Sequence, residues 1–170
     1  MGADRASRVD TRSVRRRAVD YAGLADMKAD LDRIAAAYAS GTLRRLGNWD
    51  AGPVLDHLAM AVRRSIEGFP IKAPLHLRLI GPLVKKRVLS RPFEPGIKLD
   101  ASAEGQAWRA GVSFEDALSD LRAQLARVDT AAGGRERMTM PHPFFGVMTH
   151  EEWGIYHLRH GALHLSFLGA

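Results

Sequence analysis

The sequence predicts an all-α protein, built as a four-helix bundle with long connecting loops and a short extra helix. Three observations support this fold class. Four segments repeat apolar residues at steps of three and four, which is the spacing of one helix face. No segment sustains the alternation of apolar and polar residues that a half-buried strand requires, and no internal repeat is visible. Four main helices with long connections between them are typical of a helical bundle.

The first predicted helix covers residues 23–40, and Gly41 is its expected C-terminal cap. Its apolar stripe consists of Leu24, Met27, Leu31, Ile34 and Tyr38. The second helix follows Asp50, the expected N-cap, and Pro53 fits its first turn, where a backbone N–H is not needed. Its inward stripe consists of Val54, Leu58, Val62, Ser65 and Phe69. Both helices are therefore expected to bury one face in the bundle.

The middle of the chain gives a mixed signal. Residues 70–95 are apolar enough to pack, but Gly81–Pro82 is expected to break or restart any helix there. Residues 91–108 and 129–146 are rich in Gly, Pro and polar residues, so we predict two irregular loops. These loops are the long connections of the expected bundle.

The other two main helices have clear starts. Ser113 is expected to cap a helix with a regular apolar side. That side consists of Phe114, Leu118, Leu121, Leu125 and Val128. The last helix opens at Thr149, and Glu152 three residues later completes a capping-box pattern.

Length and composition predict one soluble domain. A chain of 170 residues with 46% apolar and 26% charged residues is ordinary for a single globular domain. The absence of Cys excludes disulfides, Cys-ligated metals and Cys nucleophiles. No apolar run reaches the ~18 residues of a membrane span, and the first residues lack the apolar segment of a secretory signal. We therefore expect a cytoplasmic protein with no membrane partner.

The net charge of +6 raises the question of an acidic partner. Six arginines precede the first patterned segment: Arg5, Arg8, Arg12, Arg15, Arg16 and Arg17. We interpret residues 1–17 as a basic, flexible leader and residues 18–170 as the single helical domain. Nucleic acid is not an expected partner, because no aromatic interleaving or recognition motif accompanies the arginines. The basic stretch 84–91 could bind a phosphate or an acidic thiol cofactor, but we interpret it as a solvated helix face.

Three histidines, His157, His160 and His164, lie within eight positions of the last predicted helix. At about 100° per residue, the other two fall within about 60° of His160, in the sector of the large apolar residues Trp153 and Phe167. A buried imidazole needs hydrogen-bond partners at its ring nitrogens, or a metal on one of them. The i, i+4 pair formed by His160 and His164 can reach one ion from a single helix. The spacing leaves two alternatives open, a metal site or a set of structural core histidines.

A site with two histidines is incomplete, because a catalytic zinc typically takes three protein ligands and keeps one position open. Without Cys, the third ligand must be another His or a carboxylate, and the histidine candidates are His57, His76, His142, His150 and His157. His57 lies at the edge of its apolar stripe, so periodicity does not select it. His157 lies on the same side of its helix as His160 and His164. However, three ligands from one helix can rarely bind the same ion.

Several motifs resemble one known superfamily. Residues 46–62, LGNWDAGPVLDHLAMAV, resemble the start of the second helix in the DinB-like superfamily, also called the YfiT-like metal-dependent hydrolases. Residues 142–168, HPFFGVMTHEEWGIYHLRHGALHLSFL, resemble its closing segment with an HxxxH pair. Together with GNW at 47–49, GP at 81–82 and PGIK at 95–98, they are most similar to a branch catalogued as a domain of unknown function.

The resemblance implies a bundle in up-down-down-up order that holds one divalent ion through His57, His160 and His164. Superfamily metals are usually zinc or nickel, and three imidazoles suit either. Characterised relatives include enzymes that use low-molecular-weight thiols such as mycothiol or bacillithiol. The implied function is therefore a metal-dependent thiol transferase or hydrolase that acts on a small molecule.

Four further residues are candidates for the surroundings of the ion or the walls of a pocket: His142, His157, Trp49 and Trp153. The alternative for His142 is a rigid turn flanked by prolines, and the alternative for both tryptophans is core anchoring. No catalytic residue is identified. For the whole chain, the alternative is a non-catalytic helical bundle that acts through dimerisation or partner binding, with a homodimer as one expected form.

Overall fold

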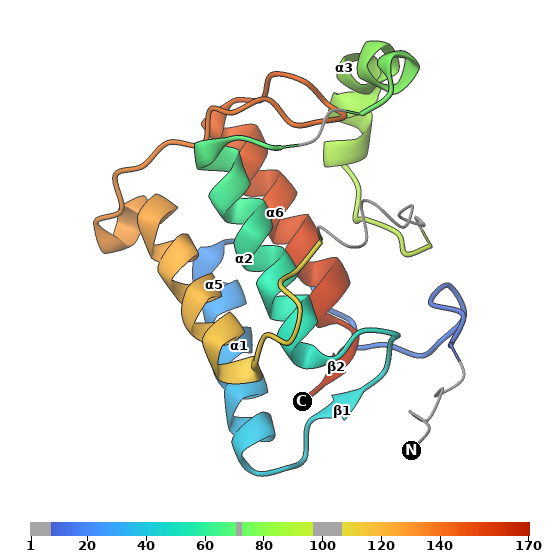
Figure 1. Ribbon diagram of the computed structural model, residues 1–170, viewed down its shortest axis with the longest axis vertical. Coiled ribbons are helices and arrows are strands. Elements are labelled where there is room, and N and C mark those ends of the chain that lie inside the picture. The colour runs from blue at the N-terminus through green and yellow to red at the C-terminus, as the bar shows by residue number, and fades with distance from the viewer. Residues whose placement is uncertain (1–7, 71–72, 97–106) are drawn as a thin grey trace.

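The structure is a computed structural model, and it describes residues 8–70, 73–96 and 107–170. These residues form a mostly helical protein with five α-helices, one 3₁₀ helix and a two-stranded sheet (Figure 1). The elements are α1 (Leu24–Ala39), β1 (Arg44–Arg45), α2 (Ala51–Glu67), α3 (Leu75–Leu89), α5 (Phe114–Val128), η1 (Thr130–Ala132), α6 (His150–Leu165) and β2 (Leu168–Gly169). Within those ranges, no helix has the length and apolar composition that a bilayer crossing demands.

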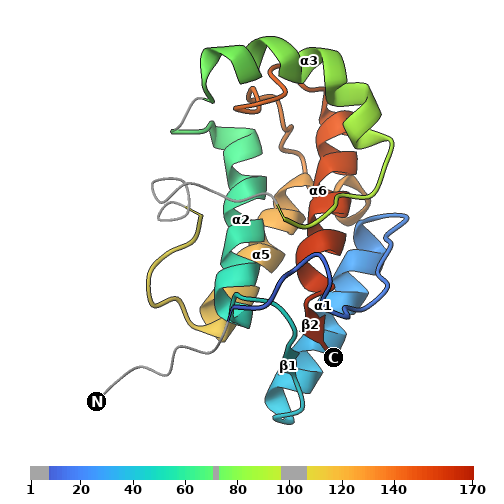
Figure 2. The same ribbon diagram turned by 90° about the vertical axis from the view of Figure 1, so that its right-hand side faces the viewer.

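Four helices enclose the hydrophobic core. Each of α1 and α2 packs against both α5 and α6. Figures 1 and 2 show these four helices side by side along the long axis of the molecule. Fully buried side chains from all four meet between them, including Met27 of α1, Leu55 of α2, Leu121 of α5 and Trp153 of α6. Of the predicted all-α fold, the structure confirms a mostly helical protein, which also contains a two-stranded sheet.

Two of the three predicted N-caps make the expected side-chain hydrogen bonds. The Ser113 hydroxyl accepts a hydrogen bond from the Asp116 backbone N–H, which confirms the cap of α5. Thr149 and Glu152 form the complete capping box of α6. Asp50 precedes α2 as predicted, but its side chain makes no capping bond.

The prediction that Gly81–Pro82 breaks the helix is wrong, because α3 runs without interruption through both residues. Pro82 is exposed, so water can reach the Arg78 carbonyl that loses its usual N–H donor. Gly81 has a packing role instead, since a Cβ there would lie 1.8 Å from the carbonyl oxygen of Phe144. The close approach of the two backbones lets α3 lie across one end of the packed helices (Figure 2).

A short antiparallel pair joins the C-terminal end to the connection between α1 and α2. Arg44 pairs with Gly169, and Arg45 pairs with Leu168. The sequence did not predict this sheet, because two residues per strand are too few to display an alternating pattern. The pairing holds the end of α6 close to the start of α2.

The end of the predicted leader is anchored to the packed helices. Arg17 donates one hydrogen bond of 2.8 Å to each carboxylate oxygen of the fully buried Asp30. Tyr21 donates a third bond to the same carboxylate, at 2.6 Å. Burial alone would raise the pKa of Asp30, but these hydrogen bonds keep it below its ordinary value. Arg17, which the sequence placed outside the domain, therefore fixes the N-terminal segment to α1.

Candidate metal centre

Three histidines from two helices meet between the packed helices. His57 of α2 and His160 and His164 of α6 each place one ring nitrogen within 4.8 Å of the other two. The Nε2 atoms of His57 and His160 are 3.0 Å apart. Among the described residues, this is the only group of three or more His, Asp or Glu side chains arranged closely enough to share an ion.

The helix geometry explains how these rings converge. His160 and His164 are four residues apart on α6, so their side chains lie on one face with ring centroids 4.6 Å apart. Because α2 packs against α6, His57 faces both of them across the helix contact. Its ring centroid is 4.8 Å from each of the other two. The structure thus brings together the i, i+4 pair and one of the five candidates for the third ligand.

A backbone contact determines the tautomer of His57. Its Nδ1 lies 3.0 Å from the carbonyl oxygen of Ala107, and a carbonyl oxygen can only accept a hydrogen bond. Nδ1 must therefore carry the proton, and Nε2 presents its lone pair to the other two histidines. Metal-binding histidines in proteins commonly donate their second ring N–H in this way, which fixes the ring orientation.

The spacing between the Nε2 atoms of His57 and His160 fits a shared ion. Two nitrogens that each bind zinc at about 2.0–2.1 Å lie roughly 3 Å apart, since their angle at the ion is between a right angle and the tetrahedral value. The His57–His160 distance of 3.0 Å matches that separation. The other ring nitrogen of His160, Nδ1, is buried and has no hydrogen-bond partner among the described residues, whichever atom Nε2 binds.

Electrostatics favour the neutral, metal-binding form of all three rings. Burial is the largest cause of a lowered pKa at His57, His160 and His164. The neighbouring imidazoles lower the pKa of His160 and His164 further. Because a histidine binds a metal through an unprotonated nitrogen, a lowered pKa keeps these ligands available at neutral pH.

Aromatic side chains surround the three histidines. Trp49 stacks on His164 with a centroid distance of 5.2 Å and an interplanar angle of 11°, and its ring also lies 5.3 Å from that of His57. Trp108 packs against Trp49 at 4.6 Å. Trp49, which the sequence proposed as a pocket wall, is therefore in direct contact with two of the histidines.

His157 and Trp153, the other α6 candidates, belong to a separate group of contacts. His157 Nε2 lies 3.2 Å from the Ser65 hydroxyl, and the imidazole stacks on Trp153 at 5.3 Å. Trp153 is fully buried, and its indole N–H donates to the Met140 carbonyl. These contacts agree with the core-anchoring alternative for Trp153 and give His157 a hydroxyl partner in place of an ion.

The remaining histidines also lie outside the triad. His142 Nδ1 accepts hydrogen bonds from the backbone N–H groups of Phe144 and Phe145, both at 3.1 Å, as expected for the rigid-turn alternative. Burial lowers the pKa of His142 to about 4. His150 Nδ1 accepts from a backbone N–H in the preceding loop, and His76 is exposed on α3. The structure therefore selects His57 among the five candidates.

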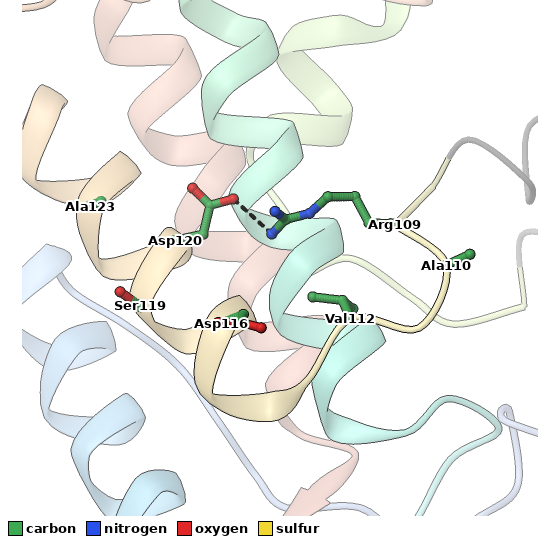
Figure 3. A pocket seen from close by; sticks show the side chains of 7 residues that line it. All are labelled: Arg109, Ala110, Val112, Asp116, Ser119, Asp120 and Ala123. Carbon is green, nitrogen blue, oxygen red and sulfur yellow. Dashed lines mark hydrogen bonds and ion pairs between the residues drawn. The ribbon is translucent and has the colours of Figure 1, made fainter.

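The sequence reasoning missed the segment that holds Ala107 in place. Asp56, fully buried beside His57 in sequence, accepts hydrogen bonds from the backbone N–H and the guanidinium of Arg109, at 2.6 Å and 2.8 Å. Figure 3 shows the same guanidinium reaching Asp120 of α5, at 3.1 Å. The signal for this contact was a charged residue, Asp56, inside an otherwise apolar helix face. Its ion pair fixes the chain two residues after the Ala107 carbonyl that orients His57.

Comparison with known proteins gives one match, which covers most of the chain. Residues 14–170 match a family described as "Protein of unknown function (DUF1569)". No curated protein and no solved structure matches the chain. The family match begins before Arg17, so it includes the anchored end of the predicted leader.

Proposed function

This chain belongs to the DUF1569 family, and we propose that it is a metal-dependent enzyme of DinB type in which His57, His160 and His164 hold one divalent ion. The observation that carries the proposal is the convergence of three imidazole nitrogens, from two helices, within 4.8 Å of one another. The up-down-down-up helix order of the DinB-like bundle is part of the same proposal.

The donor set suits zinc or nickel. Three neutral imidazoles are good ligands for either ion, and the set contains no hard oxygen ligand that would favour magnesium or calcium. An ion held by neutral ligands keeps its full positive charge, so it can activate water for hydrolysis or bind a thiol as the thiolate. The absence of Cys suits the second reaction, because the sulfur nucleophile would arrive as a small-molecule cosubstrate.

The side chains around the triad support a small organic substrate. Trp49 and Trp108 provide apolar ring surface beside His57 and His164. On the other side, the Tyr156 ring lies 5.2 Å from that of His160. Burial raises the pKa of Tyr156, so its hydroxyl stays protonated and can donate a hydrogen bond to a bound molecule. We assign these rings to substrate contact and the exclusion of water.

Metal analysis of protein purified without a histidine tag tests the proposal. We expect about one divalent ion per chain in the wild type, because three protein ligands complete a catalytic site. His160→Ala should lose the ion, since two ligands remain. His76→Ala is the matched control, because His76 is exposed on α3 and remote from the triad in the chain, and it should retain the ion.

The outcomes separate the proposed function from its alternative. A folded wild type that takes up no zinc or nickel would favour a non-catalytic bundle. If the ion binds, metal-dependent consumption of a low-molecular-weight thiol would identify a transferase. Metal-dependent cleavage without a thiol would identify a hydrolase.

A further inference from the structure

Exposed apolar side chains gather on α3. Nine large hydrophobic side chains are exposed among the described residues, and five of them belong to this helix. These five are Leu75, Leu77, Leu79, Ile80 and Leu83. Leu83 is the most exposed, at 84%, and Leu79 and Leu75 lie one and two turns before it on the same face. A sixth, Val147, is 75% exposed, and its carbonyl accepts a hydrogen bond from Lys85 of α3.

The same segment is strongly basic. Residues 68–93 contain six Lys and Arg and no Asp or Glu. The whole chain has 25 basic and 19 acidic residues, so the remainder is balanced at 19 of each. On and just after α3, Arg78, Arg87 and Arg91 are exposed and make no ion pair with another described residue. Positive charge is therefore concentrated beside the exposed leucines.

The position of α3 makes this surface accessible. Figures 1 and 2 both show the helix at one end of the long axis, and Figure 2 shows it lying across the ends of other helices. Its exposed leucines occupy the first two-thirds of the helix, and most of its basic residues follow at the C-terminal end. A broad, flat partner can therefore approach this end without meeting the rest of the bundle.

We propose that α3 binds the surface of a membrane that contains anionic lipids. Leu79 and Leu83 enter the boundary between headgroups and acyl chains, and Arg87 and Arg91 contact the lipid phosphates. Helices that bind the surface of anionic membranes combine aliphatic and basic side chains in this way. The sequence suggested no membrane partner because it lacks a spanning segment, but a helix that lies in the interface does not need one.

Charge and polarity favour lipid over other occupants. A second copy of this chain, docked through the same face, would bring two segments of the same positive charge close together, which opposes association. Nucleic acid matches the charge but offers no apolar layer to receive Leu79 and Leu83. An anionic bilayer satisfies both the leucines and the arginines.

Sedimentation with lipid vesicles tests the proposal on the full chain. We expect binding to phosphatidylcholine vesicles that contain about one-third phosphatidylglycerol, and little binding to pure phosphatidylcholine, because each nearby basic residue contributes about fivefold to partitioning. Arg87→Gln should accordingly weaken binding about fivefold. The double variant Leu79→Glu/Leu83→Glu should abolish it. The matched control is Ile155→Glu, which changes an exposed apolar residue of α6 and should bind like the wild type.

Several results would overturn the proposal. They are equal binding to neutral and anionic vesicles, no binding by a wild type with a native circular dichroism spectrum, and full binding by the double leucine variant. A wild-type dimer that the leucine variant converts to a monomer, without vesicle binding, would assign the face to a second copy. The proposal is independent of the metal centre, so His160→Ala should still bind vesicles and the leucine variant should still bind metal.

Discussion

Helix α6 buries two kinds of histidine within eight residues. The Nε2 atom of His157 lies 3.2 Å from the Ser65 hydroxyl of α2. One turn further along the helix, His160 lies 3.0 Å from another imidazole nitrogen of α2, that of His57. Burial lowers the pKa at both positions, so both rings are neutral at neutral pH. The difference between a structural histidine and a candidate ligand therefore lies in the residue that the neighbouring helix presents.

The largest difference between the structural histidine and the candidate ligands should be the effect of zinc on the free energy of unfolding. With free zinc at roughly a thousand times its dissociation constant, an ion that binds only the folded protein adds about 4 kcal/mol to the free energy of unfolding. We expect this gain in the wild type and its loss in His164→Ala. Thermal or denaturant unfolding with and without zinc measures it.

His157→Ala is the matched variant within the same helix. It should lower the stability of the metal-free protein but keep the zinc-dependent gain, because His157 is not one of the three converging histidines and pairs with Ser65 instead. Loss of the gain in His157→Ala, or its survival in His164→Ala, would contradict the distinction between the two kinds of histidine.

A smaller effect is expected at the hydroxyl that pairs with His157. Ser65→Ala removes the partner of a buried imidazole nitrogen, and leaving such a group unsatisfied costs about 1–3 kcal/mol. Urea unfolding of the metal-free protein measures this loss. Zinc content should stay at the wild-type level, and a Ser65→Ala protein with unchanged stability would show that His157 gains nothing from the hydroxyl.

A pH-dependent effect is expected at His142, a partly buried histidine paired with backbone N–H groups. Its pKa is about 4 in the folded protein and near 6.5 when unfolded. The unfolded state therefore binds more protons between those values, and stability falls as the pH is lowered through this window. The contribution is at most about 1.4 kcal/mol for each pH unit.

The non-titrating variant His142→Asn isolates this contribution. Its free energy of unfolding, measured from pH 6.5 down to pH 4, should fall less steeply than that of the wild type. Parallel curves for the two proteins would mean that His142 has the same pKa in both states. Above pH 6.5 the two slopes should agree, because His142 is then neutral whether folded or unfolded.

The parts of the fold that depend on local pattern were predictable from the sequence. The capping box at Thr149 and the i, i+4 pair His160 and His164 follow from residues that are close together in the chain. Periodicity also placed α1, α2 and α5 close to their observed bounds. Local rules failed at Gly81–Pro82, because the packing of Gly81 against Phe144 belongs to the tertiary structure.

The position of His57, the third histidine of the triad, could not be predicted from local sequence patterns either. His57 lies at the edge of the α2 stripe, and only the contact between α2 and α6 determines that it faces the pair. Periodicity left five histidines as candidates, and the resemblance to the DinB-like superfamily named His57. The Ala107 carbonyl and the Asp56–Arg109 ion pair carried no motif at all, because they join a loop to a helix some fifty positions away.

X-ray absorption spectroscopy of the zinc-loaded protein tests most directly whether three imidazoles hold one ion. The wild type should show three imidazole nitrogens at about 2.0–2.1 Å from zinc, and His57→Ala should show two or lose the ion. A wild-type spectrum with fewer than three imidazoles, or one that His57→Ala leaves unchanged, would contradict the account.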